Sequence, residues 1–316
     1  MNPSTVPSTN HARRQQGFSL VELAMVLLVV GLLAALFLPA TSTMMDNNRR
    51  NETRTKLEAL EAAMTRFVMT NQRLPCPADG SLGPSDADYG RELRTAATGL
   101  CTALSTGVVP WVTLGVSQTD ALDAWNSVIT YRVRGDLPSA ATSLGLTLDA
   151  ALDMTVCDVA GTSAAVAQSL GVTPHNRLGC NPACVSPSPP AASCTPPNLW
   201  LADRGLRVDA DAAGTILMNP ASPALTGAAY LLISHGSNKA GGYNVNGGVP
   251  QPANGPGPGT LELQNANNTA LRLPPDFYID TDLNETPDVN SYYDDIVLRP
   301  TVMKVVLDAG LGPRSH

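Results

Sequence analysis

The sequence predicts an α+β fold, in which one long N-terminal helix packs on an antiparallel β-sheet. An apolar run begins at Phe18 and passes without a break into a charged segment with helical spacing of its apolar residues. After residue 75 the chain becomes rich in glycine, proline, serine and threonine, and its short apolar runs are typical of strands. These two compositions in this order indicate a helix followed by a sheet domain.

The first half of the predicted helix is apolar on every side. Residues 18–38 contain a single charged side chain, that of Glu22. At about 1.5 Å per residue this run is long enough to cross a hydrocarbon core of about 30 Å. We therefore expect residues 18–40 to form a membrane-spanning helix, in which a carboxylate needs a specific partner.

The second half of the helix, residues 41–72, is predicted to be amphipathic. An apolar stripe recurs every three or four residues among charged ones, at Leu57, Leu60, Met64, Phe67 and Val68. Asn71 and Pro75 mark the end of the helix. The stripe needs an apolar surface to pack on, and the sheet supplies one.

Residues 73–316 are predicted to form one α+β domain with a large insertion between about residues 136 and 228. The candidate strands are residues 108–114, 127–134, 229–234 and 296–306. In the second of these, Thr130, Arg132 and Arg134 alternate with apolar residues, which is typical of a half-buried antiparallel strand. Residues 181–198 and 246–259 are rich in proline or glycine and are predicted to be loops.

The most specific signal of the sequence lies around Gly17. A polar leader containing Arg13 and Arg14 ends in Gly17, so cleavage there leaves the whole apolar helix on the mature chain. GFSLVE at residues 17–22, followed by the apolar helix, resembles the processing motif of type IV pilin-like proteins, which include the type II secretion pseudopilins. The motif covers under a tenth of the chain.

The resemblance implies a role for each residue of the motif. A prepilin peptidase cleaves after Gly17 and N-methylates Phe18, and Glu22 pairs with the N-terminal amine of a neighbouring subunit during assembly. A buried carboxylate is tolerated when such an opposite charge neutralises it. The alternative is that Glu22 only reaches toward the lipid headgroups. We favour the pairing.

Charge and cysteine content give opposite indications of the orientation in the membrane. Basic residues are more numerous after the span than before it, which by charge alone places the C-terminal part in the cytoplasm. All six cysteines lie beyond the span, however, which favours an oxidising compartment. The peptidase also requires a cytoplasmic leader. We therefore predict a single-pass protein of the bacterial inner membrane, with its domain in the periplasm and incorporated into a pseudopilus or pilus.

The cysteines are predicted to form disulfides. Cys180, Cys184 and Cys194, with His175 nearby, do not have the spacing of a tight zinc knuckle. Among the possible pairings we favour Cys76 with Cys101. The other four then staple the insertion, namely Cys157, Cys180, Cys184 and Cys194.

A second group of segments resembles the globular domain of pseudopilins. They are LPCP at 74–77, DAWNSVITYRV at 123–133, ISHGSNKAGGYN at 233–244 and YYDDIV at 292–297. In major pseudopilins a glycine-rich loop and acidic residues before the final strand hold calcium. The resemblance implies Asn238, Asp294 and Asp295 as side-chain candidates, although Asn238 stands where the family has aspartate. Their oxygens suit Ca²⁺, the one cofactor that we consider.

A nearby acidic stretch imitates the start of an EF-hand loop, but Glu285 occupies the position of the required glycine. The stretch consists of Asp280, Asp282, Asn284 and Asp288. We interpret it as a solvated acidic loop.

The sequence favours a structural subunit over an enzyme. It has no GxSxG, HExxH or P-loop motif, and His235 beside Ser234 and Ser237 is the one weak sign of nucleophilic chemistry. A net charge of -7 speaks against nucleic-acid binding. We predict a subunit of a type II secretion pseudopilus; the alternatives are a minor pilin of a type IV pilus and a membrane-anchored periplasmic binding module or hydrolase. The expected partners are prepilin peptidase, other pilin or pseudopilin subunits, the inner-membrane assembly platform and membrane lipid.

Overall fold

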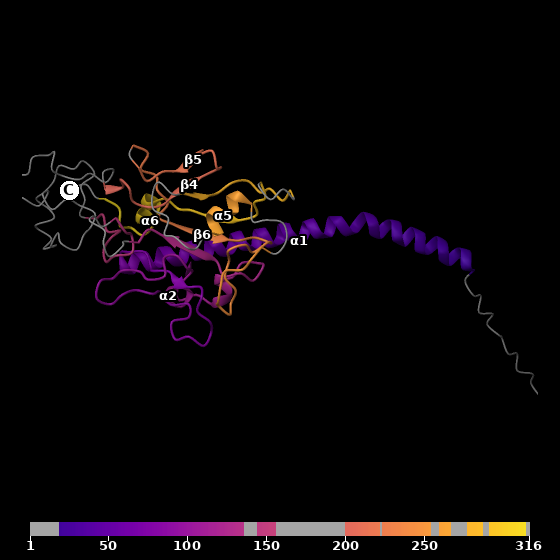
Figure 1. Ribbon diagram of the computed structural model, residues 1–316, viewed down its shortest axis with the longest axis horizontal. Helices are drawn as coiled ribbons and strands as arrows, with labels where there is room; N and C mark the ends of the chain where they lie inside the picture. Colours follow the sequence, from indigo (N-terminus) through magenta and orange to yellow (C-terminus); the bar gives the residue numbers. More distant parts are fainter. Residues whose placement is uncertain are drawn as a thin grey trace, which may run out of the picture. The chain divides into compact units, whose positions relative to one another are not determined.

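The computed structural model describes residues 19–135, 144–155, 200–221, 223–253, 259–266, 277–286 and 291–313, without the side chains of residues 34–43. The chain separates into two compact units, residues 1–48 and 49–316. Helix α1 (Leu20–Asn71) begins in the first unit and ends in the second. Figure 1 shows it as one continuous helix. It ends at Asn71, one of the two residues that were predicted to mark its end.

In the first unit, the described residues form the N-terminal part of α1. Residues 20–33 all have exposed side chains, among them Leu20 at 87% and Leu28 at 67%. Within the part of the chain that the structure describes, no helix combines the length and the apolar character needed to cross a membrane. The predicted span, residues 18–40, lies partly outside the described residues.

The second unit is built around a five-stranded sheet in the order β1-β2-β3-β6-β8, and all its neighbouring strands are antiparallel. The strands are β1 (Ala78–Asp79), β2 (Gly107–Val108), β3 (Thr130–Val133), β6 (Tyr230–Ser234) and β8 (Ile296–Leu298). In the central pair, Thr130 aligns with Ile233 and Val133 with Tyr230. The predicted antiparallel sheet is therefore present.

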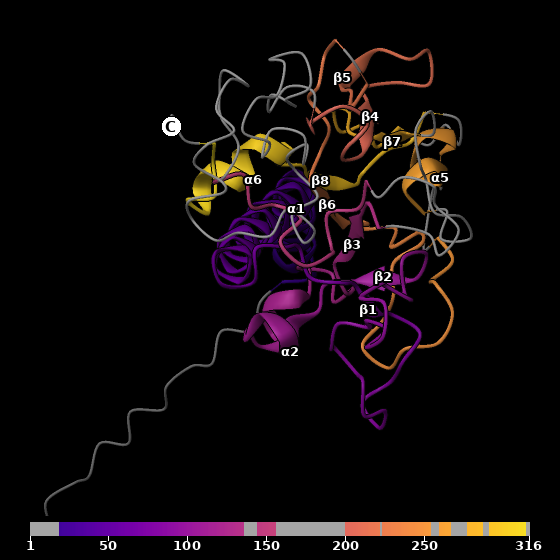
Figure 2. The ribbon, with the colours of Figure 1, turned by 90° about the vertical axis from the view of Figure 1, so that its left-hand side faces the viewer.

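The C-terminal part of α1 packs on this sheet. Leu57, Leu60, Met64 and Val68 are buried in one core with Tyr131, Tyr230 and Leu232 of the sheet. Helix α6 (Val302–Asp308) contributes Val302, Val305 and Val306 to the same core. Figure 2 shows α1 and α6 on one side of the strands. Four of the five residues of the predicted stripe thus pack as expected, and each fully buried side chain of this size contributes about 1.5–3 kcal/mol. The fifth, Phe67, is half-buried, and its ring lies 5.1 Å from the Arg73 guanidinium.

A second, three-stranded sheet covers the opposite face of β6. Its order is β5-β4-β7, with β4 (Arg207–Asp209), β5 (Ile216–Met218) and β7 (Phe277–Ile279). Strands β4 and β5 are antiparallel, whereas β4 and β7 are parallel. Because side chains alternate along a strand, Leu231 and Ile233 of β6 face this sheet and pack with Val208 and Tyr278.

The burial of β3 corrects the prediction that residues 127–134 form a half-buried strand. All four residues of β3 are buried, so both faces of the strand are covered. Arg132 is tolerated there because its Nη1 donates to the backbone oxygen of Gly107 at 2.9 Å. The predicted strand at residues 229–234 is confirmed as β6.

Two predicted strands, residues 108–114 and 296–306, are wrong over most of their length, and a proline follows the short strand that is present in each. Strand β2 ends at Val108, and helix α2 (Trp111–Leu114) follows Pro110. Strand β8 ends at Leu298, and after Pro300 the hydroxyl of Thr301 accepts from Lys304 N at the start of α6. Proline ends the strand because it has no amide hydrogen for the ladder.

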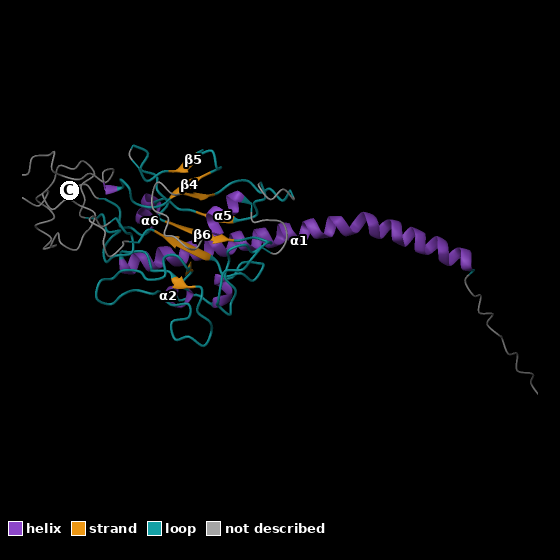
Figure 3. Ribbon diagram, in the orientation of Figure 1, coloured by secondary structure: helices purple, strands orange, loops and turns teal. Residues whose placement is uncertain are grey.

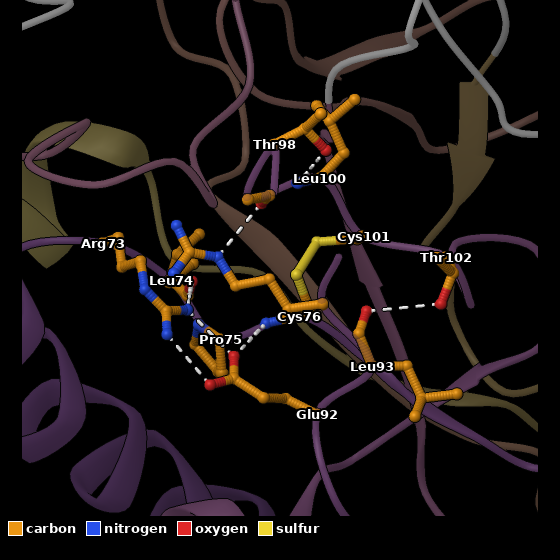
Figure 4. Close-up of a disulfide and its surroundings, with 12 residues drawn as sticks. Arg73, Leu74, Pro75, Cys76, Glu92, Leu93, Thr98, Leu100, Cys101 and Thr102 are labelled. Carbon is orange, nitrogen blue, oxygen red and sulfur yellow. Dashed lines mark hydrogen bonds and ion pairs between the residues drawn. A yellow bond between two sulfur atoms is a disulfide. The ribbon is translucent and has the colours of Figure 1, made fainter. Parts of the chain in front are cut away.

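A disulfide joins Cys76 and Cys101, with a Cα–Cα distance of 5.3 Å (Figure 4), as the sequence analysis favoured. Glu92 lies beside it, accepting hydrogen bonds from Arg73 Nη1 and Nη2, both at 2.9 Å, and from Cys76 N at 3.0 Å. The four remaining cysteines, Cys157, Cys180, Cys184 and Cys194, lie outside the described residues.

Loops make up much of the second unit (Figure 3). Residues 246–253 and 259, the described part of one predicted loop, contain no helix or strand. The predicted insertion, residues 136–228, contains β4 and β5. The other predicted loop, residues 181–198, lies outside the described residues.

Candidate functional site

The N-terminal motif is described from its third residue onward. Gly17 and Phe18 lie outside the described residues. Ser19 and Glu22 form a reciprocal pair at the start of α1: Ser19 N donates to Glu22 Oε2 at 3.0 Å, and Glu22 N donates to Ser19 Oγ at 3.2 Å. This arrangement is a capping box, which satisfies amides that have no partner within the helix. It directs the Glu22 carboxylate toward the N-terminal end of the helix.

The second site is a cluster of three acidic side chains in the second unit, here called the acid cluster. Glu262 comes from the short helix α5 (Thr260–Ala266), and Asp294 and Asp295 come from the residues before β8. All three are buried, and each offers a carboxylate oxygen within 4.8 Å of the others. The structure therefore brings two predicted residues together with one that the sequence analysis missed.

The glycine-rich loop after β6 holds one oxygen of Asp294 and leaves the other without a partner. Asp294 Oδ2 accepts from Ser237 N and Ser237 Oγ, both at 2.7 Å, and from Asn238 N and Tyr292 Oη, both at 3.1 Å. Asp294 Oδ1 is buried and has no hydrogen-bond donor among the described residues. This oxygen is therefore available to a ligand that lies between the carboxylates of the cluster.

Gly236 allows the loop to approach this carboxylate so closely. Its φ angle is +54°, a conformation that favours glycine. A Cβ atom at this position would lie 2.4 Å from Asp294 Cγ. Any other residue at position 236 would therefore push the loop away from the acid cluster.

Asn238, the third predicted residue, lies at the acid cluster and orients Glu262. Its Nδ2 donates to Glu262 Oε2 at 2.7 Å, and its Oδ1 accepts from Ala240 N at 2.9 Å. The other oxygen of Glu262, Oε1, accepts from Asp294 N at 2.9 Å. Glu262 is thus held between the glycine-rich loop and the residues before β8.

Asp295 has neutral and weakly basic neighbours. Asn265 Nδ2 donates to its Oδ2 at 2.8 Å, and His235 Nδ1 lies 3.6 Å from its Oδ1. The other nitrogen of His235, Nε2, lies 2.9 Å from Thr130 Oγ1. All of these groups are buried, so the acid cluster is separated from solvent on this side.

Burial controls the electrostatics of the acid cluster. It raises the pKa of Glu262 to about 8, and the neighbouring charge of Asp295 acts in the same direction. Burial also raises the pKa of Asp295, although contact with His235 opposes this. A divalent cation would compensate the three carboxylates, and the all-oxygen donor set suits Ca²⁺ or Mg²⁺. The residues present therefore fit a hard cation.

The serines beside His235 do not form a catalytic arrangement with it. Ser234 Oγ donates to Asp123 Oδ2 at 2.7 Å, and Ser237 Oγ donates to Asp294. The hydroxyl that lies next to His235 belongs to Thr130, which is fully buried in β3. Within the described residues, this histidine has no exposed nucleophile to activate.

Sequence reasoning missed Glu262, although the sequence carries a signal for it. Glu262 is the only charged residue between Lys239 and Arg272. A single acidic residue in a long uncharged stretch is a candidate for a specific contact, but its partner Asp294 lies 32 residues away. Only the folded chain shows that they meet.

Comparison with known protein families identifies the N-terminal segment. Residues 12–38 match the prokaryotic N-terminal methylation motif, and the matched range contains Gly17, Phe18 and Glu22. No curated protein and no solved structure matches the chain.

Proposed function

We propose that this chain, whose N-terminal segment places it in the type IV pilin-like family, is a structural subunit of a filament. In this proposal the chain is cleaved after Gly17, N-methylated at Phe18 and inserted into a bundle of apolar helices. The observation that carries the proposal is the match of residues 12–38 to the methylation motif. The residues expected for cleavage and methylation, Gly17 and Phe18, both lie within it.

The start of α1 supports the part that we assign to Glu22. Its carboxylate already accepts a hydrogen bond from Ser19 N, at the residue next to Phe18. Cleavage after Gly17 would create a positive amine on Phe18. In a bundle of such helices, the Glu22 carboxylate of one subunit pairs with the amine of its neighbour, which neutralises both charges in an apolar surrounding.

The exposed apolar surface of α1 supports assembly in the same way. Residues 20–33 expose their side chains, and most of these are large and apolar. Such a surface needs lipid or neighbouring helices to cover it. Identical head-to-tail contacts between subunits build an open helical filament rather than a closed ring.

Within the family, we assign the chain to a type II secretion pseudopilus. The segments that resemble pseudopilins come together in the second unit, since Asp123 binds Ser234 and the loop at residues 236–238 wraps Asp294. We further propose that the acid cluster binds Ca²⁺ through Glu262, Asp294 and Asp295. The ion would supply the positive charge that fixes the glycine-rich loop, α5 and the residues before β8 to one another.

Filament incorporation tests the proposal. The full chain and its Glu22→Ala variant are produced in cells with a pseudopilus assembly system, and sheared filaments are separated from membranes. The proposal predicts that both forms insert into the membrane and that only the unchanged chain enters the filaments in quantity. Equal incorporation of Glu22→Ala would remove the charge-pairing role.

A further inference from the structure

Arg50 is a buried cation on α1, in the first turn of the second unit. Its side chain is 7% exposed, and its guanidinium lies 5.8 Å from the ring centroid of Trp125. Nη2 forms an ion pair with Glu285, and Nη1 donates to the backbone oxygen of Asp294 at 3.5 Å. These partners matter because a buried charge without them is costly.

Both partners of Arg50 lie between β7 and β8, the part of the chain that also supplies Asp294 and Asp295 to the acid cluster. Asn284, next to Glu285, exchanges two backbone hydrogen bonds with Tyr293, at 2.9 and 2.8 Å. Tyr293 in turn precedes Asp294. The position of Glu285 is therefore tied to the position of Asp294 by backbone pairing.

Asp294 contacts both the acid cluster and Arg50. Its carboxylate belongs to the cluster, its backbone N donates to Glu262 Oε1 at 2.9 Å, and its backbone O accepts from Arg50. A cation held between the three carboxylates would fix the position of the Asp294 side chain. Because the backbone oxygen of the same residue accepts from Arg50, a shift of Asp294 on cation binding also moves that oxygen relative to the guanidinium.

A second contact with α1 fixes the loop that carries Trp125, the aromatic neighbour of Arg50. Thr53 Oγ1 accepts from Ala124 N at 3.1 Å, one residue before Trp125. Trp125 N donates to Asp123 Oδ1 at 2.9 Å. The aromatic ring beside Arg50 is therefore held by α1 as well as by its own loop, and Arg50 is confined between this ring and the residues before β8.

We infer from these contacts that Arg50 couples cation binding at the acid cluster to the packing of α1 in the second unit. The inference rests on the cation site of the proposed function and adds a positioning residue outside the ligand set. Coupling between two equilibria is reciprocal. Arg50 holds Asp294 where its carboxylate faces the other two, so it increases the affinity for the cation, and the cation in turn strengthens the contacts of α1 around residue 50.

The test uses the full chain in detergent micelles with Ca²⁺ as the probe. Calorimetry compares the Ca²⁺ affinity of the unchanged chain, Arg50→Ala and Arg54→Ala. Arg54 is the matched control, one turn further along α1, because its side chain is exposed and contacts Asn51 at 3.5 Å. We expect Arg50→Ala to weaken binding on the order of threefold to tenfold and Arg54→Ala to leave it unchanged.

Hydrogen exchange supplies a readout that needs no variant. Ca²⁺ is expected to slow amide exchange at residues 50–57 of the unchanged chain. A second variant, Glu285→Gln, keeps the shape of a side chain that is 48% exposed and removes its charge. It should weaken Ca²⁺ binding and reduce the slowing of amide exchange by Ca²⁺ without unfolding the chain.

Three results would overturn the inference. Equal Ca²⁺ affinity in the unchanged chain and in Arg50→Ala would leave the cation site standing and remove the coupling. Unchanged exchange at residues 50–57 on addition of Ca²⁺ would do the same, even if Arg50→Ala does not fold. Absence of Ca²⁺ binding by the unchanged chain would overturn the cation site, and the coupling with it.

Discussion

Without a cation, the second unit should become less stable as the pH rises, because Glu262 is more easily ionised in the unfolded chain than in the folded one. Burial raises the pKa of Glu262 from 4.5 to about 8. The stability from its protonated form is fully present below pH 4.5 and is lost as the pH rises through 8. At about 1.4 kcal/mol per pKa unit, the loss by pH 7 is on the order of 3 kcal/mol.

The Glu262→Gln variant isolates this contribution because glutamine does not titrate. Urea unfolding is followed by tryptophan fluorescence in the full chain with a chelator present, between pH 4.5 and 8. Trp111, Trp125 and Trp200 are all buried and report on the second unit. Asp123 and Asp295 also have pKa values raised by burial, so both forms lose stability with pH, and the difference between their slopes belongs to Glu262.

Two results test whether Glu262 is protonated in the folded chain without a cation. The unchanged chain should lose more stability than Glu262→Gln between pH 4.5 and 7, and saturating Ca²⁺ should remove most of that extra loss. Parallel pH profiles for the two forms would contradict this prediction, because they would mean that Glu262 is ionised in the folded chain without a cation.

Three further predictions follow from single contacts. Replacing Cys76 and Cys101 together by serine should lower the free energy of unfolding by about 3 kcal/mol in urea titrations, and an unchanged midpoint would contradict this. Gly236→Ala should weaken Ca²⁺ binding in calorimetry because its Cβ meets Asp294, whereas Gly310→Ala, whose φ is also positive but which has no neighbour within 4 Å, should not. Ser19→Ala should speed amide exchange in the first turn of α1, at a cost of about 1 kcal/mol, and unchanged exchange would show that the capping box does not stabilise the helix.

The sequence predicted the elements whose signals are local. The stripe from Leu57 to Val68 has the helical period, and β6 is a short apolar run bounded by turn residues, so both could be recognised without tertiary contacts. Two predicted strands were wrong over most of their length because a short apolar run fits either a strand or a short helix. Pro110 and Pro300, which interrupt these runs, decide between the two.

The burial of β3 and the complete acid cluster could not be predicted, because both depend on distant parts of the chain. Thr130 and Arg132 of β3 are buried against His235 and the backbone of Gly107, which lie 105 and 25 residues away in the chain. Glu262 reaches Asp294 across 32 residues, and its helix α5 has only seven residues and a weak local signal. Asp294 and Asp295 were found because they lie together in one recognisable segment.

The most direct test of the account is the mass of the N-terminal peptide of the chain, extracted from membranes of cells with an active prepilin peptidase. We predict a mature chain that begins at Phe18 and carries one added methyl group on its amine. A chain that retains residues 1–17 in those cells, and loses none of them when the peptidase is overproduced, would contradict the assignment to a processed filament subunit.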